Sequence, residues 1–339
     1  NDYATNDIVM IYHADMYALP GLDEEINKYI KKGVVVSGTR IEPPLHPDGP
    51  EKILADYGIE PEEFDEYKLL NEYESFKRDT TTEGIFAPWA IMKEDFQSIG
   101  GHDPLYAPQS KEDSDIFNRF VLAGYKLVQT WKGFVYHMTC RGSRFADGAK
   151  RNPDGQVFMK NRETDEWLQQ NQRSTRNFIR KWGSFVNHDQ YLKPIIKPKR
   201  DVGIYIENCT LSELVEYEPW CSTIYINSKN AKEIYIKNEQ VNTFYDLDEK
   251  IKVIPTGLIE DEVQKYFKND VIIIFNFSDR FGNNQSPTAV IHNLSAILDN
   301  EQELEVGEFV IGNLNIIIKK IKTYEKNLII CEKEIEENV

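Results

Sequence analysis

Cysteine is scarce in this chain of 339 residues, and its four cysteines are scattered, with no paired spacing. They are Cys140, Cys209, Cys221 and Cys331. Such a distribution does not indicate a disulfide framework, so we expect buried free thiols and a reducing, cytoplasmic environment. The chain also has no apolar run as long as the roughly 20 residues of a membrane-spanning helix, and no signal peptide opens it. We therefore expect no transmembrane segment.

Basic residues are fewer than acidic residues. The 40 Lys and Arg residues face 56 Asp and Glu residues, which leaves a formal net charge of −16 at pH 7. This balance argues against nucleic acid as a partner, because nucleic-acid binding needs a basic face, and against an anionic membrane surface. The remaining composition, 40% apolar and 12% aromatic, is typical of a globular protein, and the length is sufficient for two domains.

A short apolar run near the N-terminus precedes residues that suit a metal site. Residues 8–11 predict a strand buried on both faces, and His13 and Asp15 follow it, before a helix predicted over 22–32. Ligands of open α/β sheets bind beyond the carboxyl ends of strands. An imidazole and a carboxylate one residue apart can both turn toward one divalent cation. This stretch alone leaves open the alternative that they are only surface polar residues before a helix.

The following residues alternate between strand and helix patterns, which predicts a mixed sheet over residues 1–145. We expect an apolar stretch interrupted by proline over 85–92 and an acidic, solvated helix and loop over 59–78. The other expected strands are 34–40, which should lie beside the strand at 8–12, then 125–130 and 133–137. The other expected helices are a short one near 50–57 and one over 116–123, with Ser110 as its candidate cap.

The composition changes after a segment rich in lysine and proline, so we divide the chain into residues 1–145, a basic helical extension and linker over 146–200, and a smaller domain over 201–339. The last is expected to be α/β or α+β, with no catalytic constellation and with His292 as a packed or surface residue. Its expected strands are 202–206, 223–226, 233–236, 271–277 and 328–331. Its expected helices are 211–217, 260–267, 286–298 and 314–322.

The first buried strand follows almost directly after Asn1, and the chain does not start with Met. A nucleotide-binding α/β domain usually has several strand–helix units before such a strand. We therefore expect that residues upstream of Asn1 belong to the same domain.

Three polar elements stand in order along the chain, namely His13-Ala14-Asp15, Glu112-Asp113 at a predicted helix start, and His137 after a strand. With the residues around them, they resemble the GT-A glycosyltransferases, and within these glycosyltransferase family 2. The blocks that carry the resemblance are residues 7–21, residues 84–106 with FQSIGGHDPLY, and residues 112–137 with EDSDIFNRFVLAGYK and a closing VYH. The resemblance covers roughly residues 1–145, which is the acceptor-side half of the domain in the plan of that family.

The resemblance implies a metal site. Asp15 matches the last acid of the family's Asp-x-Asp motif, which binds the divalent metal, Mn²⁺ or Mg²⁺, that bridges the phosphates of a sugar nucleotide. His13 stands where the first acid usually is, and imidazole suits manganese. His137 matches a histidine that completes the metal site in several relatives.

The resemblance also implies catalytic and substrate-binding residues. Asp113 matches the catalytic base of the family's acidic pair, with Glu112 as its neighbour. Gly100 and Gly101, with Asp103 just after them, match the turn beside the sugar pocket, and Trp89 lies in the acceptor-facing stretch.

The function implied is that of a metal-dependent, inverting, hexosyltransferase-like enzyme on a GT-A-like, Rossmann-like sheet. It would move a sugar from a nucleotide-sugar donor to a glycan, a lipid-linked acceptor or a protein, and a homo-oligomer is left open. A non-catalytic carbohydrate-binding or scaffolding module on a GT-A core is the main alternative, favoured by His13 in place of an acid. A metal-dependent phosphohydrolase is a third, although it would need more carboxylates near the metal.

Overall fold

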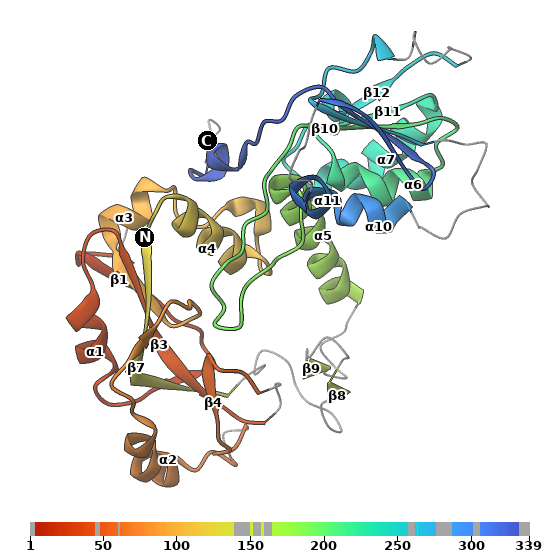
Figure 1. The fold of residues 1–339 in the computed structure, drawn as a ribbon. Coiled ribbons are helices and arrows are strands. Elements are labelled where there is room, and N and C mark those ends of the chain that lie inside the picture. The colour runs from red at the N-terminus through yellow and green to blue at the C-terminus, as the bar shows by residue number, and fades with distance from the viewer. Residues whose placement is uncertain are drawn as a thin grey trace.

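The computed structural model describes residues 4–44, 48–59, 62–138, 150–151, 157–158, 165–256, 262, 264–275, 287–300 and 306–331. Within these residues the chain forms two large mixed sheets, each with helices and its own apolar core. Figure 1 shows the first unit in red to yellow and the second in green to blue, with the long helix α5 (Asp165–Trp182) between them. The expected α/β fold is confirmed.

The first sheet has seven strands, with the order β1-β6-β3-β7-β2 along its main path, while β4 pairs with β3 and β5 pairs with β7. The two longest strands, β3 and β7, run parallel at its centre, and β1, β2 and β6 pair antiparallel with their neighbours. The strands are β1 (Ile8–Ile11), β2 (Met16–Ala18), β3 (Val34–Glu42), β4 (Lys52–Leu54), β5 (Thr81–Thr82), β6 (Trp89–Met92) and β7 (Lys126–His137).

Two expectations for β1 are wrong. It does not lie beside β3, because β6 is inserted between them. It is also not buried on both faces. Among the described residues β1 is hydrogen-bonded to β6 alone, so it is an edge strand, with Val9 buried and Ile8 and Met10 more than one third exposed. A short apolar run cannot distinguish a central strand from an edge strand, because both carry apolar residues.

The helices of the first unit are α1 (Leu22–Tyr29), α2 (Glu66–Glu72), α3 (Lys93–Ser98) and α4 (Glu112–Leu122), with short 3₁₀ turns at Tyr73–Phe76 and Pro104–Tyr106. Helix α4 starts four residues earlier than expected. Its N-cap residue is Lys111, with a left-handed φ of 75° and no capping side chain, so Ser110 does not cap it. The helix expected near 50–57 is instead strand β4, and the strands expected at 125–130 and 133–137 are one strand, β7.

The second sheet has the strand order β12-β11-β10-β13-β15-β14. Its first four strands are parallel, and β15 and β14 form an antiparallel hairpin at one edge. The strands are β10 (Val202–Ile206), β11 (Thr223–Ile226), β12 (Ile251–Val253), β13 (Val271–Phe275), β14 (Gly307–Ile311) and β15 (Leu314–Ile318). The helices are α6 (Leu211–Tyr217), α7 (Lys229–Glu239), α8 (Leu247–Lys250), α10 (Pro287–His292) and α11 (Leu294–Asn300), with 3₁₀ turns at Glu218–Trp220, Gln240–Asn242 and Glu325–Leu328.

Several expected elements of the second unit are wrong. Residues 233–236 lie inside helix α7, and the helix expected over 314–322 is strand β15. Residues 325–328 form a 3₁₀ turn where a strand was expected to begin at 328. Residues 260–267 and the end of the strand expected at 271–277 fall partly outside the described residues. His292 is packed, as expected, with its ring stacked on that of Trp220 at 4.1 Å between centroids.

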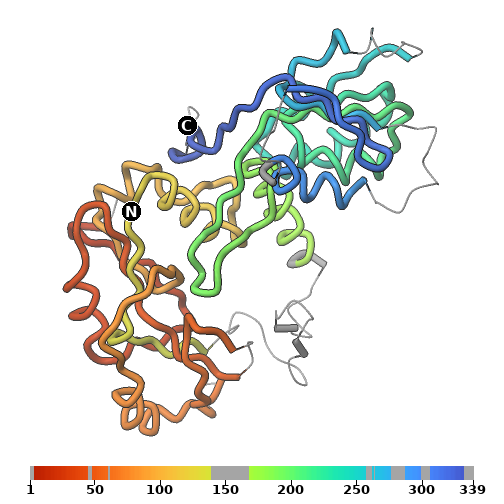
Figure 2. The backbone as a smooth tube through the Cα atoms, viewed as in Figure 1, coloured from red at the N-terminus to blue at the C-terminus, as the bar shows by residue number. Residues whose placement is uncertain are grey.

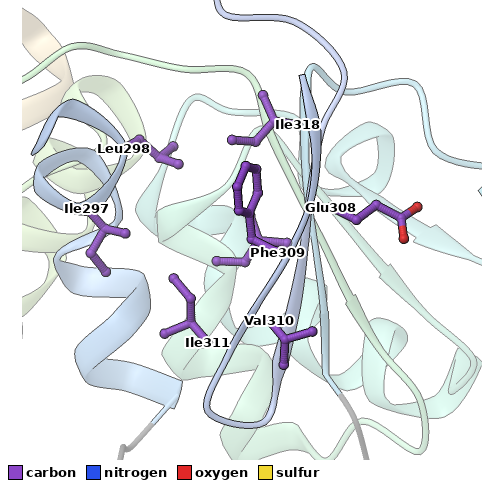
Figure 3. Close-up of a pocket in the computed structure, with 8 residues that line it drawn as sticks. Ile297, Leu298, Glu308, Phe309, Val310, Ile311 and Ile318 are labelled. Carbon is purple, nitrogen blue, oxygen red and sulfur yellow. The ribbon is translucent and has the colours of Figure 1, made fainter. Parts of the chain in front are cut away.

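An apolar cavity of about 360 Å³ lies between helix α11 and the β14–β15 hairpin. Figure 3 shows Ile297 and Leu298 of α11 on one side and Phe309 of β14 on the other. Glu308 also borders the cavity, but its side chain points away from α11. The cavity therefore belongs to the apolar packing of the second unit.

Helix α5 contacts both units. Phe178 and Trp182 pack with Leu105 and Tyr106 of the first unit, and Ile179 joins the core of the second. After α5 the chain loops back along the first unit before it enters β10 (Figure 2), and there the carbonyl of Tyr191 lies directly against Gly84.

The remaining expectations concern thiols and membrane spans. Cys209, Cys221 and Cys331 are buried and form no disulfide among the described residues, and Cys140 lies outside these residues. No helix in the described ranges has the length and apolarity needed to cross a membrane.

Candidate functional site

His13, Asp15 and His137 meet at one edge of the first sheet. Each offers one potential ligand atom, and these atoms lie within 4.8 Å of one another. The Oδ2 atom of Asp15 is 3.5 Å from Nε2 of His137. The expected proximity of Asp15 and His137, which are 122 residues apart in the sequence (137 − 15), is confirmed by this distance.

Strand pairing brings these residues together. His13 and Asp15 lie in the turn between β1 and β2, and Met16, the first residue of β2, pairs with His137 at the end of β7. The turn is closed by a hydrogen bond from the amide of Met16 to the carbonyl of His13, at 3.2 Å. A second hydrogen bond, from the amide of Met138 to the carbonyl of Asp15 at 2.9 Å, joins the turn to the residue after β7. The backbone therefore fixes the spacing of the cluster.

Glu42 is a member of the site that the sequence analysis missed. It is the last residue of β3, which runs parallel to β7, so the two strands end at the same edge of the sheet. Its Oε1 atom lies 2.8 Å from Nδ1 of His137, and its side chain is only 1% exposed. Arg40 and Lys52 hold the same carboxylate at 2.9 and 3.1 Å. With Nδ1 engaged by Glu42, the Nε2 atom of His137 is the one directed at Asp15.

The pKa values in this cluster reflect its paired charges. Burial alone would lower the pKa of His137, but the hydrogen bonds and negative charges of Asp15 and Glu42 raise it above its usual value. Burial opposes ionisation of Asp15, yet the hydrogen bond and charge of His137 lower its pKa. Burial also opposes ionisation of Glu42, but the positive charge of Arg40 and the contact with His137 hold its pKa far below the usual range. Both carboxylates are therefore ionised at neutral pH.

Asp113 faces the same cluster from helix α4. Its Oδ2 atom is 3.4 Å from Nε2 of His13, and its side chain is 23% exposed. Asp113 is the second residue of the helix, whose N-cap residue is Lys111, so it does not occupy the capping position. The pKa of Glu112 is raised, first by burial, and among the described residues its buried Oε2 atom has no hydrogen-bond partner. Of the two acids, Asp113 is the one in contact with the cluster.

Trp89 is part of the core. It is fully buried, with its ring 5.4 Å from that of Phe120 and 6.0 Å from that of His102. Within the described residues, neither Nε1 of Trp89 nor Nδ1 of His102 has a hydrogen-bond partner. Burial lowers the pKa of His102. Two buried ring nitrogens without a described partner therefore lie near the turn at residues 100–103, which contains His102.

The turn at residues 100–103 is held by internal contacts. Gly100 and Gly101 both have left-handed φ angles, 84° and 69°. A Cβ atom on Gly100 would lie 2.5 Å from the carbonyl oxygen of Cys331, so the C-terminal segment packs directly on this turn. The carboxylate of Asp103 accepts a hydrogen bond from Lys181 at 2.7 Å and one from the amide of Leu105 at 2.9 Å. A role of these residues in substrate binding stays a prediction.

The donor set of the cluster fits a divalent transition metal. Two imidazoles and a carboxylate are ligands that Mn²⁺ accepts, and atoms within 4.8 Å of one another can reach one ion with bonds of about 2.0–2.6 Å. Glu42 behind His137 matches the arrangement in which a carboxylate orients a metal-binding histidine. One wall of the cluster is the Phe86 ring, whose centroid is 5.8 Å from that of His13 and which is covered by the Arg40 guanidinium at 4.0 Å.

Two comparisons with known proteins gave no match. No protein-family model matches the chain, and no curated protein matches it.

Proposed function

We propose that this protein is a metal-dependent, inverting glycosyltransferase that uses a nucleotide-sugar donor. The observation that supports this function best is the cluster of His13, Asp15 and His137, with the carboxylate of Asp113 only 3.4 Å from His13. A potential metal site and a partly exposed carboxylate beside it are the two parts that metal-assisted transfer to a hydroxyl group requires. The order of these residues along the chain is that of the GT-A glycosyltransferases described above.

In this proposal, His13, Asp15 and His137 hold the metal, and Glu42 orients His137. The bound metal supplies positive charge that stabilises a departing nucleoside diphosphate. Asp113 accepts the proton of the acceptor hydroxyl while the acceptor oxygen bonds to the anomeric carbon of the sugar and the bond from that carbon to the diphosphate oxygen breaks. Attack from the face opposite the leaving group inverts the anomeric configuration, and a single carboxylate is sufficient as the base.

His13 and Glu112 bear on the choice of metal and on the choice of base. His13 replaces the first acid of the family motif, so the metal would be bound by one carboxylate and two imidazoles, a set that favours Mn²⁺ over Mg²⁺. Burial raises the pKa of Glu112, so it is held less readily as an anion than an exposed glutamate. Asp113, which is partly exposed and 3.4 Å from His13, is therefore the acid of the pair that we assign as the base.

The experiment is a turnover screen on the full chain with a panel of nucleotide sugars, Mn²⁺ or Mg²⁺, and glycan, lipid-linked and peptide acceptors. We expect release of nucleoside diphosphate that depends on both metal and acceptor, and that is lost in Asp15→Asn.

Other outcomes of the screen support the alternatives. Hydrolysis of phosphate esters without a sugar acceptor would indicate a phosphohydrolase. Binding of glycans with no turnover of any donor, in a chain that binds metal and is folded, would indicate a carbohydrate-binding module and contradict the proposal. His188→Ala is an exposed-histidine control, because His188 lies at the surface and its Nδ1 atom contacts the backbone carbonyl of Asp189.

A further inference from the structure

Helix α5 holds helix α4 through one buried carboxylate. Asp115 is fully buried and lies two residues after Asp113, in the first turn of α4. Its Oδ1 atom contacts the last two residues of α5: it forms an ion pair with Lys181 at 2.7 Å and accepts a hydrogen bond from Nε1 of Trp182 at 2.9 Å. Its Oδ2 atom accepts a hydrogen bond from Nε of Arg119 at 2.8 Å. Both oxygens of Asp115 are thus used to fix the turn that carries Asp113.

The same groups fix the turn at residues 100–103 against α4. Lys181 also donates to Oδ2 of Asp103 at 2.7 Å, and its side chain is only 7% exposed. Arg119 donates to the carbonyl of Gly101 at 2.6 Å. One buried ammonium therefore lies between two carboxylates that belong to different elements. Without it, Asp103 and Asp115 would repel each other in a medium of low dielectric constant.

The other face of α5 is fixed to the second unit. Arg180, the residue next to Lys181, is completely buried and contacts Glu218 at 2.6 Å and Glu239 at 2.8 Å. Lys250 also contacts the carboxylate of Glu218, at 2.6 Å. Neighbouring residues of one helix thus join the two units, Arg180 to the second and Lys181 to the first.

We propose that Lys181 is a positioning residue, through which helix α5 and the second unit hold Asp113 in the orientation needed to accept the proton of the acceptor. This inference rests on the proposed function. Catalytic groups must be placed to within a fraction of an ångström, and a misplacement of about 1 Å can cost about 10²-fold in rate. The second unit then has a role in the reaction although none of its described side chains belongs to the cluster.

The test compares Lys181→Met, Lys181→Arg and the control Lys193→Met in the full chain. Lys193 forms an ion pair with Glu83 at the surface, where the two side chains are 42% and 63% exposed, so the control removes a lysine from an ion pair of the connecting loop. The first readout is kcat and KM for the donor, measured well below the melting temperature of each variant. The second is hydrogen exchange of the amides at residues 112–116, which needs no activity.

We expect kcat to fall about 10- to 100-fold in Lys181→Met, because the turn that carries Asp113 loses its anchor. KM for the donor reports separately on the turn at residues 100–103, which Lys181 also holds through Asp103. Exchange at residues 112–116 should become at least about 10-fold faster, since the first turn of α4 loses its anchor. Lys181→Arg, which restores a cation, should recover most of the wild-type kcat and most of the protection of residues 112–116 from exchange. Lys193→Met should resemble the wild type in both readouts.

The proposal is overturned if Lys181→Met lowers the melting temperature but leaves kcat and the exchange of residues 112–116 at the values of Lys193→Met. If Lys181→Met does not fold, Trp182→Phe removes the indole N–H from Asp115, together with part of the buried ring, while Lys181 stays in place, and it should change both readouts in the same direction by a smaller factor. If the wild type transfers no sugar, the proposed function fails, and hydrogen exchange alone decides whether Lys181 anchors the turn.

Discussion

Glu42→Gln is the most informative single substitution, because Glu42 serves both the candidate metal site and the stability of the first sheet. Its carboxylate is 1% exposed and contacts His137 at 2.8 Å, Arg40 at 2.9 Å and Lys52 at 3.1 Å. Glutamine preserves the size of the side chain and removes its charge. Two cations then lose a buried anion, and His137 has a neutral amide beside its Nδ1 atom in place of the carboxylate.

The size of the effect follows from the burial. Removing one partner of a buried ion pair costs about 3–5 kcal/mol. Glu51 lies 3.7 Å from Arg40 and 3.6 Å from Lys52 and remains as a partial partner, so we expect the lower end, about 3 kcal/mol. Because the folded-state pKa of Glu42 is depressed, its contribution to stability is present above its unfolded pKa of about 4.3 and is lost as the pH falls toward the folded value. The stability difference between wild type and variant should therefore begin to narrow near pH 4 and continue to shrink at lower pH.

Chemical denaturation at pH 7 and near pH 4 measures the stability, and titration calorimetry measures Mn²⁺ affinity, which should fall about 10- to 100-fold because a group that orients a metal-binding histidine is lost. The control is Glu51→Gln, which removes a carboxylate near the same Arg40 and Lys52 but has no contact with His137. It should leave Mn²⁺ affinity unchanged. Equal metal affinity in Glu42→Gln and Glu51→Gln would refute the role assigned to Glu42.

Three further predictions concern Asp113, His137 and Gly100. Asp113→Asn should leave folding and donor binding close to normal and lower transfer by about 10²-fold or more, measured as kcat, whereas near-normal turnover would assign the base to another group. Since the pKa of His137 is raised, protons should compete with the metal already above the usual histidine pKa of about 6.5, and Mn²⁺ affinity should fall as the pH is lowered from about 8 to 6, measured by calorimetry. Gly100→Ala should lower the free energy of unfolding by more than the roughly 1 kcal/mol expected for Gly124→Ala, because both have positive φ but only Gly100 faces a backbone oxygen at 2.5 Å.

Much of the fold was predictable because buried parallel strands have a clear pattern. Residues 202–206 and 223–226 are short runs rich in β-branched and aromatic residues, and both are strands as expected. Residues 314–318 were wrongly assigned to a helix, although Gly312-Asn313 between two apolar runs is a signal for a tight hairpin turn. The run Leu-Asn-Ile-Ile-Ile fits a helix or a strand by apolar content alone, and only pairing with β13 and β14 decides between them.

The site was predictable in part. The order of His13, Asp15, Asp113 and His137 indicated which residues to bring together, and their proximity in the fold agrees with it. Glu42 was missed because its place beside His137 depends on where β3 ends and on its register with β7. Trp89 was expected in the acceptor-facing stretch, but pairing of β6 between β1 and β3 places its side chain in the core.

The contacts of Lys181 and Trp182 with Asp115 could not be read from the sequence, because they join residues more than 60 positions apart across two units. Polar residues on a basic helix are ordinarily solvated, and nothing in their spacing distinguishes a buried anchor from a surface charge. Only the packing of α5 against the turn at residues 100–103 makes Lys181 a buried cation.

Binding of Mn²⁺ to the full chain, measured by titration calorimetry, tests the central claim most directly. The account predicts one Mn²⁺ ion per chain, with binding abolished or greatly weakened in Asp15→Asn and in His137→Ala, and unchanged in the exposed-histidine control His188→Ala. Wild-type protein that binds no divalent metal, or binding that is the same in all four proteins, would contradict the assignment of His13, Asp15 and His137 as a metal site.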